Sequence, residues 1–118
     1  MSEPILRPEA IEALRAVSPD DEGAFFRELI DIFLADTPIR IAELRNAVDA
    51  ANAGAAVRAA HSIKGSAGNF GAQNLAQLAL ELETLAKSSQ LAAVAARFGE
   101  LEQAFAAVQG ALLALRNS

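Results

Sequence analysis

The sequence predicts an all-α fold, an antiparallel four-helix bundle with a short additional N-terminal helix. Alanine makes up 28 of the 118 residues, and alanine is the best helix former and a poor strand residue. Apolar residues recur in steps of three and four along four long segments, which short loops connect. Four such helices close most naturally as an antiparallel bundle, and the length suits a single domain over residues 1–118.

The first two predicted helices lie before residue 50. A short helix begins at Pro8, because proline suits the first helical position, and the stretch SPDDEG ends it. A long helix then starts near Phe26. Its apolar stripe consists of Phe26, Leu29, Ile30, Phe33, Ile41, Leu44 and Val48. Pro38 interrupts this stripe without changing its phase, so we expect one helix kinked near Pro38 rather than a new helix capped by Thr37.

The second half of the chain contains three further predicted features. One helix runs from about Ala55 to Phe70 and ends at Gly71, and the stretch AQNLAQLALELETLAKSS forms the next. The last helix has the most regular stripe, formed by Leu91, Val94, Phe98, Leu101, Phe105, Val108, Leu112 and Leu115. A two-stranded coiled coil through this helix is the alternative architecture. It is the weaker one, because the other three stripes then lack partners.

The composition excludes several functional classes. Ten basic and fifteen acidic side chains give a net charge of -5, whereas nucleic-acid binding relies on clustered basic residues. The chain has no cysteine, which excludes disulfides and thiolate metal sites. The first ten residues lack a basic segment, and no stretch approaches the roughly 18 apolar residues of a membrane span. We therefore expect a cytoplasmic protein without nucleic-acid or membrane partners, and the initial methionine favours a free-standing one.

The segment AAHSIKGSAGNFG contains the only histidine, His61, followed by two glycines within two helical turns. A glycine inside a helix costs about 1 kcal/mol relative to alanine, so helix stability does not explain them. At about 100° per residue, the apolar side of this helix is centred opposite His61. Gly54, Gly65 and Gly68 lie within about 40° of the histidine. His61 is therefore expected to face outward from a strip with few side chains.

Arg58 and Lys64 flank His61 at about 60° on either side. An exposed imidazole with open access and cations beside it suits nucleophilic attack on a phosphoryl group. Part of the imidazole is neutral at cytoplasmic pH because its free pKa is about 6.5, and Lys64 can donate a charge-assisted hydrogen bond. A single histidine without cysteine does not supply the ligands of a zinc or haem site. No metal site and no cofactor are expected on this chain.

The run HSIKGS at residues 61–66 resembles the H-x-[IL]-K-G-[SA] signature of histidine-containing phosphotransfer (HPt) domains, the helical intermediates of multistep two-component phosphorelays. The upstream run ELIDIFLADTPIRIAELRNAVDA is similar to the family's long second helix. The downstream run AGNFGAQNLAQLALELETLA is similar to its glycine turn and following helix. The resemblance covers the chain from about Asp21 to Lys87.

The resemblance implies roles for individual residues. His61 is expected to accept the phosphoryl group and give it up, Lys64 to help neutralise it, and Gly65 to keep the approach open. The family also places a Gln or Glu from the next helix against the histidine ring, and the matching position is Glu83. A carboxylate that accepts the proton of one ring nitrogen fixes the tautomer and raises the basicity of the other. Glutamate is expected to do this more strongly than glutamine.

A phosphorelay carrier also needs a docking surface for its partners. The first half of the long helix is so rich in apolar residues that they cannot all point inward, and we expect part of this set to be exposed beside the histidine. The predicted binding residues are Phe25, Ile30, Leu34, Arg58, Gly65 and Gly68. The equal alternative is that the short N-terminal helix covers the apolar ones.

The sequence thus predicts a phosphoryl carrier rather than an enzyme. It is expected to accept the group from a receiver-domain aspartate and pass it to another, with the magnesium ion held by the receiver. The expected partners are response-regulator receiver domains and a sensor or hybrid histidine kinase, and the carrier itself is expected to be a monomer. Two other classes stay open, a module that binds receivers without being phosphorylated and a structural bundle that dimerises through the last helix.

Overall fold

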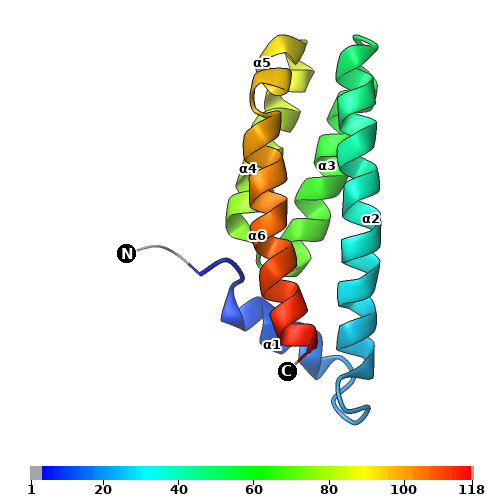
Figure 1. Ribbon diagram of the computed structural model, residues 1–118, viewed down its shortest axis with the longest axis vertical. Helices are drawn as coiled ribbons and strands as arrows, with labels where there is room; N and C mark the ends of the chain where they lie inside the picture. Colours follow the sequence, from blue (N-terminus) through cyan, green and yellow to red (C-terminus); the bar gives the residue numbers. More distant parts are fainter. Residues whose placement is uncertain (1–3, 118) are drawn as a thin grey trace.

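Residues 4–117 are described by the computed structural model and form six helices without a strand (Figure 1). The helices are α1 (Pro8–Ala16), α2 (Ala24–Asp49), α3 (Ala53–Asn69), α4 (Gln73–Lys87), α5 (Leu91–Ala96) and α6 (Phe98–Arg116). The prediction of an all-α fold is confirmed.

Four long helices lie side by side along the long axis of the molecule, which measures 47 × 30 × 18 Å. Helix α3 packs against α2 and α4, and α6 packs against the same two helices. In Figure 1, α2 and α4 run in one direction and α3 and α6 in the other, while α1 lies obliquely across the end where α2 begins and α6 ends. This arrangement leaves one side of α3 facing outward.

Helix α2 runs without interruption through Pro38. The constant phase of the apolar stripe on both sides of the proline predicted this continuity, and a new helix start at Thr37 is excluded. Thr37 is instead buried, and its hydroxyl has no hydrogen-bond partner among the described residues.

The last predicted helix is divided into two, which corrects the expectation of a single helix from Leu91 onward. The division falls at Arg97, whose backbone (φ -104°, ψ 8°) is not helical. Its guanidinium binds Glu81 on α4 at 2.8 Å and Glu100 on α6 at 3.0 Å. The interruption is one residue long and keeps the apolar residues in phase, so their spacing does not reveal it.

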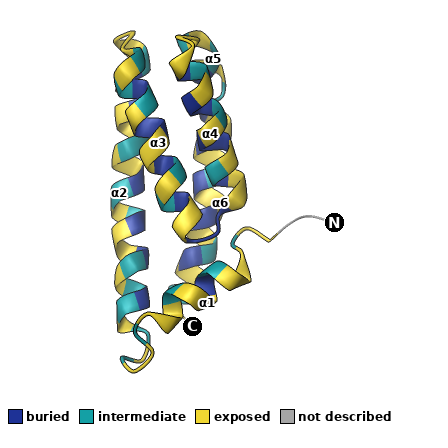
Figure 2. Cartoon of the chain, turned by 180° about the vertical axis from the view of Figure 1, so that it is seen from behind, coloured by how far each residue is buried: buried dark blue, intermediate teal, exposed yellow. Residues whose placement is uncertain are grey.

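The core lies between the inward faces of the long helices, which Figure 2 shows in dark blue. Its largest fully buried apolar side chains are Ile30, Leu44, Ile63, Leu75, Leu82, Leu101, Leu112 and Val94. Within residues 4–117, no helix is both long enough and apolar enough to cross a bilayer.

Gly71 fixes the turn between α3 and α4. Its φ of +66° is the left-handed conformation that favours glycine, and its carbonyl accepts a hydrogen bond from the backbone of Arg7 at 2.9 Å. A Cβ atom at this position would lie 2.7 Å from the Cβ of Arg7 and 2.8 Å from that of Ala10. The segment before α1 therefore packs on this turn, at the end of the helix that carries His61.

Candidate functional site

Helix α3 carries His61 on its outer face. The helix begins where the side chain of Asn52 accepts a hydrogen bond from the backbone of Ala55 at 3.1 Å, an N-cap that satisfies a free amide. Its inward face consists of Ala56, Ala59, Ala60, Ile63 and Ala67, all buried. The side chain of His61 is 65% exposed, as its position opposite this face predicts.

Glu83 on α4 holds one nitrogen of the His61 ring. The Nδ1 atom lies 3.1 Å from Oε2 of Glu83, whereas Nε2 makes no hydrogen bond within the described part of the chain. An ionised carboxylate only accepts hydrogen bonds, so the neutral ring keeps its proton on Nδ1. The lone pair of Nε2 is thereby left available on the exposed side of the molecule.

The carboxylate of Glu83 is buried, with a side chain 5% exposed, and is surrounded by donors. Nζ of Lys64 contacts Oε1 at 2.9 Å, and Nζ of Lys87 lies 3.4 Å from Oε2. The hydrogen bond from Lys64 lowers the pKa of Glu83 against the opposing effect of burial, and the hydrogen bond from His61 lowers it further. Glu83 therefore stays ionised at neutral pH.

The structure thus brings together His61, Lys64 and Glu83, the three residues predicted at the centre of the site. Lys87 is a fourth member that the sequence interpretation missed. Its signal was available, because Lys87 follows Glu83 by four residues and lies on the same face of α4. We call these four residues the Glu83 cluster.

Gly65 and Gly68 lie on the exposed strip of α3. A Cβ atom built on either glycine would meet no other atom within 4 Å, so the fold itself does not exclude alanine at these positions. Both residues leave the surface around His61 free of side chains. Packing against the rest of the fold therefore does not explain these two glycines.

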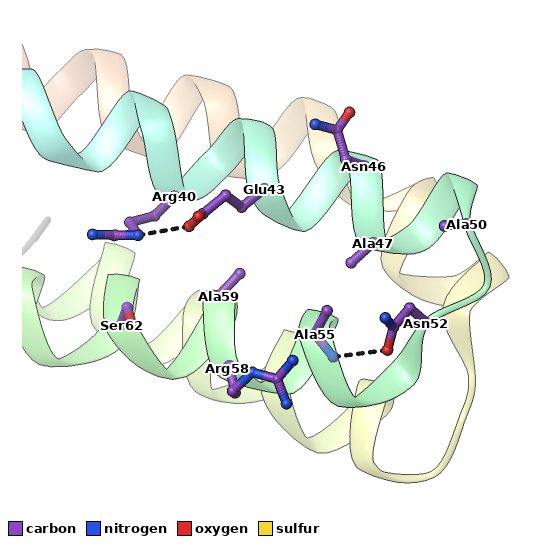
Figure 3. Close-up of a pocket in the computed structure, with 10 residues that line it drawn as sticks. All are labelled: Arg40, Glu43, Asn46, Ala47, Ala50, Asn52, Ala55, Arg58, Ala59 and Ser62. Atoms are coloured by element: carbon purple, nitrogen blue, oxygen red, sulfur yellow. Dashed lines mark hydrogen bonds and ion pairs between the residues drawn. The ribbon is translucent and has the colours of Figure 1, made fainter.

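Arg58 borders a groove of about 550 Å³ between α2 and α3. Figure 3 shows Ser62 and Ala59 of α3 facing Arg40 and Glu43 of α2 across this groove. Arg40 is bound to Glu43 at 2.8 Å, whereas Arg58 makes no ion pair with any residue in 4–117. We call the exposed side of α3 around His61, Gly65 and Gly68 the histidine strip. The predicted binding residue Arg58 is thus a cation without an ion pair at one edge of this strip.

The apolar binding residues are placed differently from the prediction. Ile30 is 0% exposed, and the expectation that it lies on the surface is wrong, because it shares the inward phase of Phe26 and Phe33. Phe25 and Leu34 are half-buried, and Leu34 packs against the core. Helix α1 lies against Phe26 of the same apolar stretch, where the guanidinium of Arg15 is 5.0 Å from the ring centre.

Two exposed isoleucines on α2 were missed. Ile32 and Ile39 are the exposed large apolar residues of this helix. They lie seven residues apart and therefore on one face. Ile39 precedes Glu43 by one helical turn, so it lies on the side of α2 that lines the groove. Both isoleucines lie outside the apolar stripe that faces the core. This position in the sequence pattern could have predicted that they are exposed.

Among residues 4–117, no group of three or more histidine, aspartate and glutamate side chains is placed to hold a metal ion. The cations of the site, Lys64, Lys87 and Arg58, suit an anionic group instead.

Comparisons with known proteins agree with this geometry. The family model of the Hpt domain matches residues 28–111, which contain the whole Glu83 cluster. The crystal structure of histidine-containing phosphotransfer protein B (HptB) from Pseudomonas aeruginosa PAO1 is similar, with a TM-score of 0.88 and 32% sequence identity. The similarity covers 98% of this chain and 97% of that chain. A comparison with curated proteins finds no match.

The family match covers well over half of the chain and includes an outward histidine held by a carboxylate. The chain therefore belongs to the Hpt domain family, the histidine-containing phosphotransfer proteins of phosphorelays.

Proposed function

We propose that this protein carries a phosphoryl group on Nε2 of His61, accepting it from the aspartyl phosphate of one receiver domain and returning it to the aspartate of another. The observation that carries the proposal is the hydrogen bond between Nδ1 of His61 and Glu83, at 3.1 Å, on a ring that is otherwise exposed. It leaves Nε2 as the nucleophilic nitrogen and turns it toward an incoming partner.

In the proposed reaction, Nε2 attacks the phosphorus atom in line with the aspartyl oxygen. The bond from phosphorus to that oxygen breaks as the bond to nitrogen forms, and the receiver aspartate leaves as a carboxylate. The ring keeps its proton on Nδ1 and becomes positively charged, which strengthens its hydrogen bond to Glu83. Phosphoryl transfer needs positioning and charge stabilisation more than covalent chemistry from the protein, so a carrier with few functional groups suffices.

The proposed receiver surface surrounds the histidine strip. Gly65 and Gly68 give the backbone close access, and Arg58 and the groove beside it offer a cation and a concave edge. Ile39 adds an exposed apolar side chain on α2. The magnesium ion belongs to the receiver in this proposal, and the carrier acts as a monomer. The cytoplasmic location expected from the sequence stays a prediction.

The test uses receiver domains from the same organism, each phosphorylated with a radioactive label and mixed with the purified protein. The wild type is expected to take up the label, and the His61→Gln variant is expected to take up none while keeping its circular dichroism spectrum. A variant that is still labelled contradicts the assignment of His61. Wild-type protein that binds a receiver without being labelled, or that forms a concentration-dependent dimer instead, supports one of the other two classes.

A further inference from the structure

Two lysines converge on one carboxylate in the Glu83 cluster, although the carboxylate needs only one of them. We propose that the two lysines have different roles, an inference that rests on the proposed function. Lys64 stays on Glu83 and holds it against the His61 ring, whereas Lys87 leaves Glu83 and pairs with the phosphoryl group on His61. This reverses the role expected for Lys64 from the family resemblance and assigns that role to a residue outside the HSIKGS run.

The contacts of Lys64 are those of a positioning residue. Its Nζ atom lies 2.9 Å from Oε1 of Glu83 and is the hydrogen-bond partner of that oxygen within residues 4–117. The side chain of Lys64 is 30% exposed and that of Glu83 5%. Removing Lys64 would leave a nearly buried carboxylate oxygen without a partner, which is costly. The contact with the Glu83 carboxylate therefore fixes the position of Lys64, and Lys64 in turn fixes the position of Glu83.

The contacts of Lys87 are those of a residue that can move. Its Nζ atom lies 3.4 Å from Oε2, which is beyond the usual range of a charge-assisted hydrogen bond. Oε2 also accepts the hydrogen bond from Nδ1 of His61, so it keeps a partner when Lys87 leaves. The side chain of Lys87 is 62% exposed, and its flexible stem lets the ammonium group change position at little cost.

Phosphorylation changes the charges in the direction that this exchange requires. The phosphorylated ring carries a positive charge and binds Oε2 more strongly through Nδ1, which reduces the attraction between Oε2 and Lys87. The phosphoryl oxygens at the same time present a new anion on the exposed side of the ring. Lys87 lies on α4, and its ammonium group is near the same Oε2 atom that binds the ring, with a side chain 62% exposed. Lys64 lies on α3 and makes the shorter contact, with the other carboxylate oxygen.

The test uses phosphoramidate as the donor, because this small molecule needs no docking surface. Nε2 of His61 attacks its phosphorus atom, the phosphorus–nitrogen bond of the donor breaks, and ammonia leaves. Lys87→Met and Lys64→Met form a matched pair that removes each ammonium group and keeps an unbranched side chain of almost the same length. We expect Lys87→Met to slow uptake about fivefold, the upper range for an exposed ion pair, and Lys87→Arg to restore it.

Nitrogen NMR of the unphosphorylated ring distinguishes the two roles. Lys87→Met is expected to leave the proton on Nδ1, as in the wild type, whereas Lys64→Met is expected to shift part of it to Nε2 because Glu83 loses its anchor.

A wild-type uptake rate in Lys87→Met, or slowed uptake that Lys87→Arg does not restore, overturns the proposed roles of the two lysines and leaves the proposed function intact. Wild-type protein that takes up no phosphoryl group from phosphoramidate or from any receiver contradicts the proposed function itself.

Discussion

Two ionic clusters contain carboxylates that lie two residues apart on α4, Glu81 and Glu83, and the compositions of the clusters differ. The Arg97 cluster consists of one cation between Glu81 and Glu100, and the Glu83 cluster has one carboxylate between Lys64 and Lys87. One cation with two carboxylates leaves a net negative charge, whereas two lysines with one carboxylate leave a net positive charge beside a neutral imidazole. Arg97, whose charge is fully paired, joins helices. Two lysines with only one carboxylate leave a positive charge beside the exposed His61 ring, and this charge can bind an anion.

Burial separates the two clusters as well. Glu81 has a side chain 42% exposed, and Glu83 has one 5% exposed. Hydrogen bonds lower the pKa of both, chiefly from Arg97 for Glu81 and from Lys64 for Glu83. The pKa is thus lowered in both clusters. The balance of charge and the exposed His61 ring, rather than the direction of the shift, distinguish the candidate site.

The largest difference is expected when each carboxylate is removed. Glu83→Ala takes away the partner of Nδ1 and frees the ring to rotate, so phosphoryl uptake from a labelled receiver is expected to fall on the order of tenfold or more. Glu81→Ala is the matched control on the same helix and is expected to keep the wild-type uptake rate while lowering the melting temperature. Equal uptake rates in the two variants would contradict the distinction between the clusters.

A smaller effect is expected from the glycines beside the functional cluster. Gly65→Ala places a methyl group in open space, so it is expected to raise the free energy of unfolding by about 0.5–1 kcal/mol. The same methyl group obstructs a docked partner, and transfer from a receiver is expected to slow while uptake from phosphoramidate is unchanged.

Gly110→Ala on α6 is the matched control for Gly65→Ala, because its Cβ atom also meets nothing within 4 Å. It is expected to stabilise the protein without slowing transfer from a receiver. The interpretation of Gly65 is wrong if both variants transfer at the wild-type rate.

The smallest expected effect is on the pH dependence of stability. The pKa of Glu83 lies below its ordinary value of 4.5 in the folded protein, so its contribution to the free energy of unfolding is complete above that pH and is lost as the pH falls through the lowered pKa. Urea unfolding between pH 7 and pH 3 is expected to show a steeper acid decline for the wild type than for Glu83→Gln. Parallel curves would show that Glu83 titrates normally.

The helical periodicity predicts much of the site because its geometry is local. His61, Lys64, Gly65 and Gly68 lie on one helix, where residue spacing alone fixes their directions. Glu83 lies on another helix, and it was assigned only through the family resemblance. Lys87 was missed because the resemblance assigned it no role and because it lies on α4, outside the periodicity of α3.

The errors in the predicted fold have equally local causes. Nearly every residue of the stretch FFRELIDIFL on α2 is apolar or lies beside an apolar one, so the pattern does not define which side faces the core. Ile30 was therefore assigned to the surface although it is buried, and exposed Ile32 was overlooked. The break at Arg97 keeps the apolar residues in phase and leaves no trace in their spacing.

The most direct test of the central claim is the NMR spectrum of the ring nitrogens after phosphorylation. His61 is the only histidine, so one ring accounts for every signal. We predict that phosphorus is coupled to Nε2 and that Nδ1 carries a proton. Phosphorus coupled to Nδ1, or label recovered on Ser62 or Ser66 with an unchanged ring, would contradict the account.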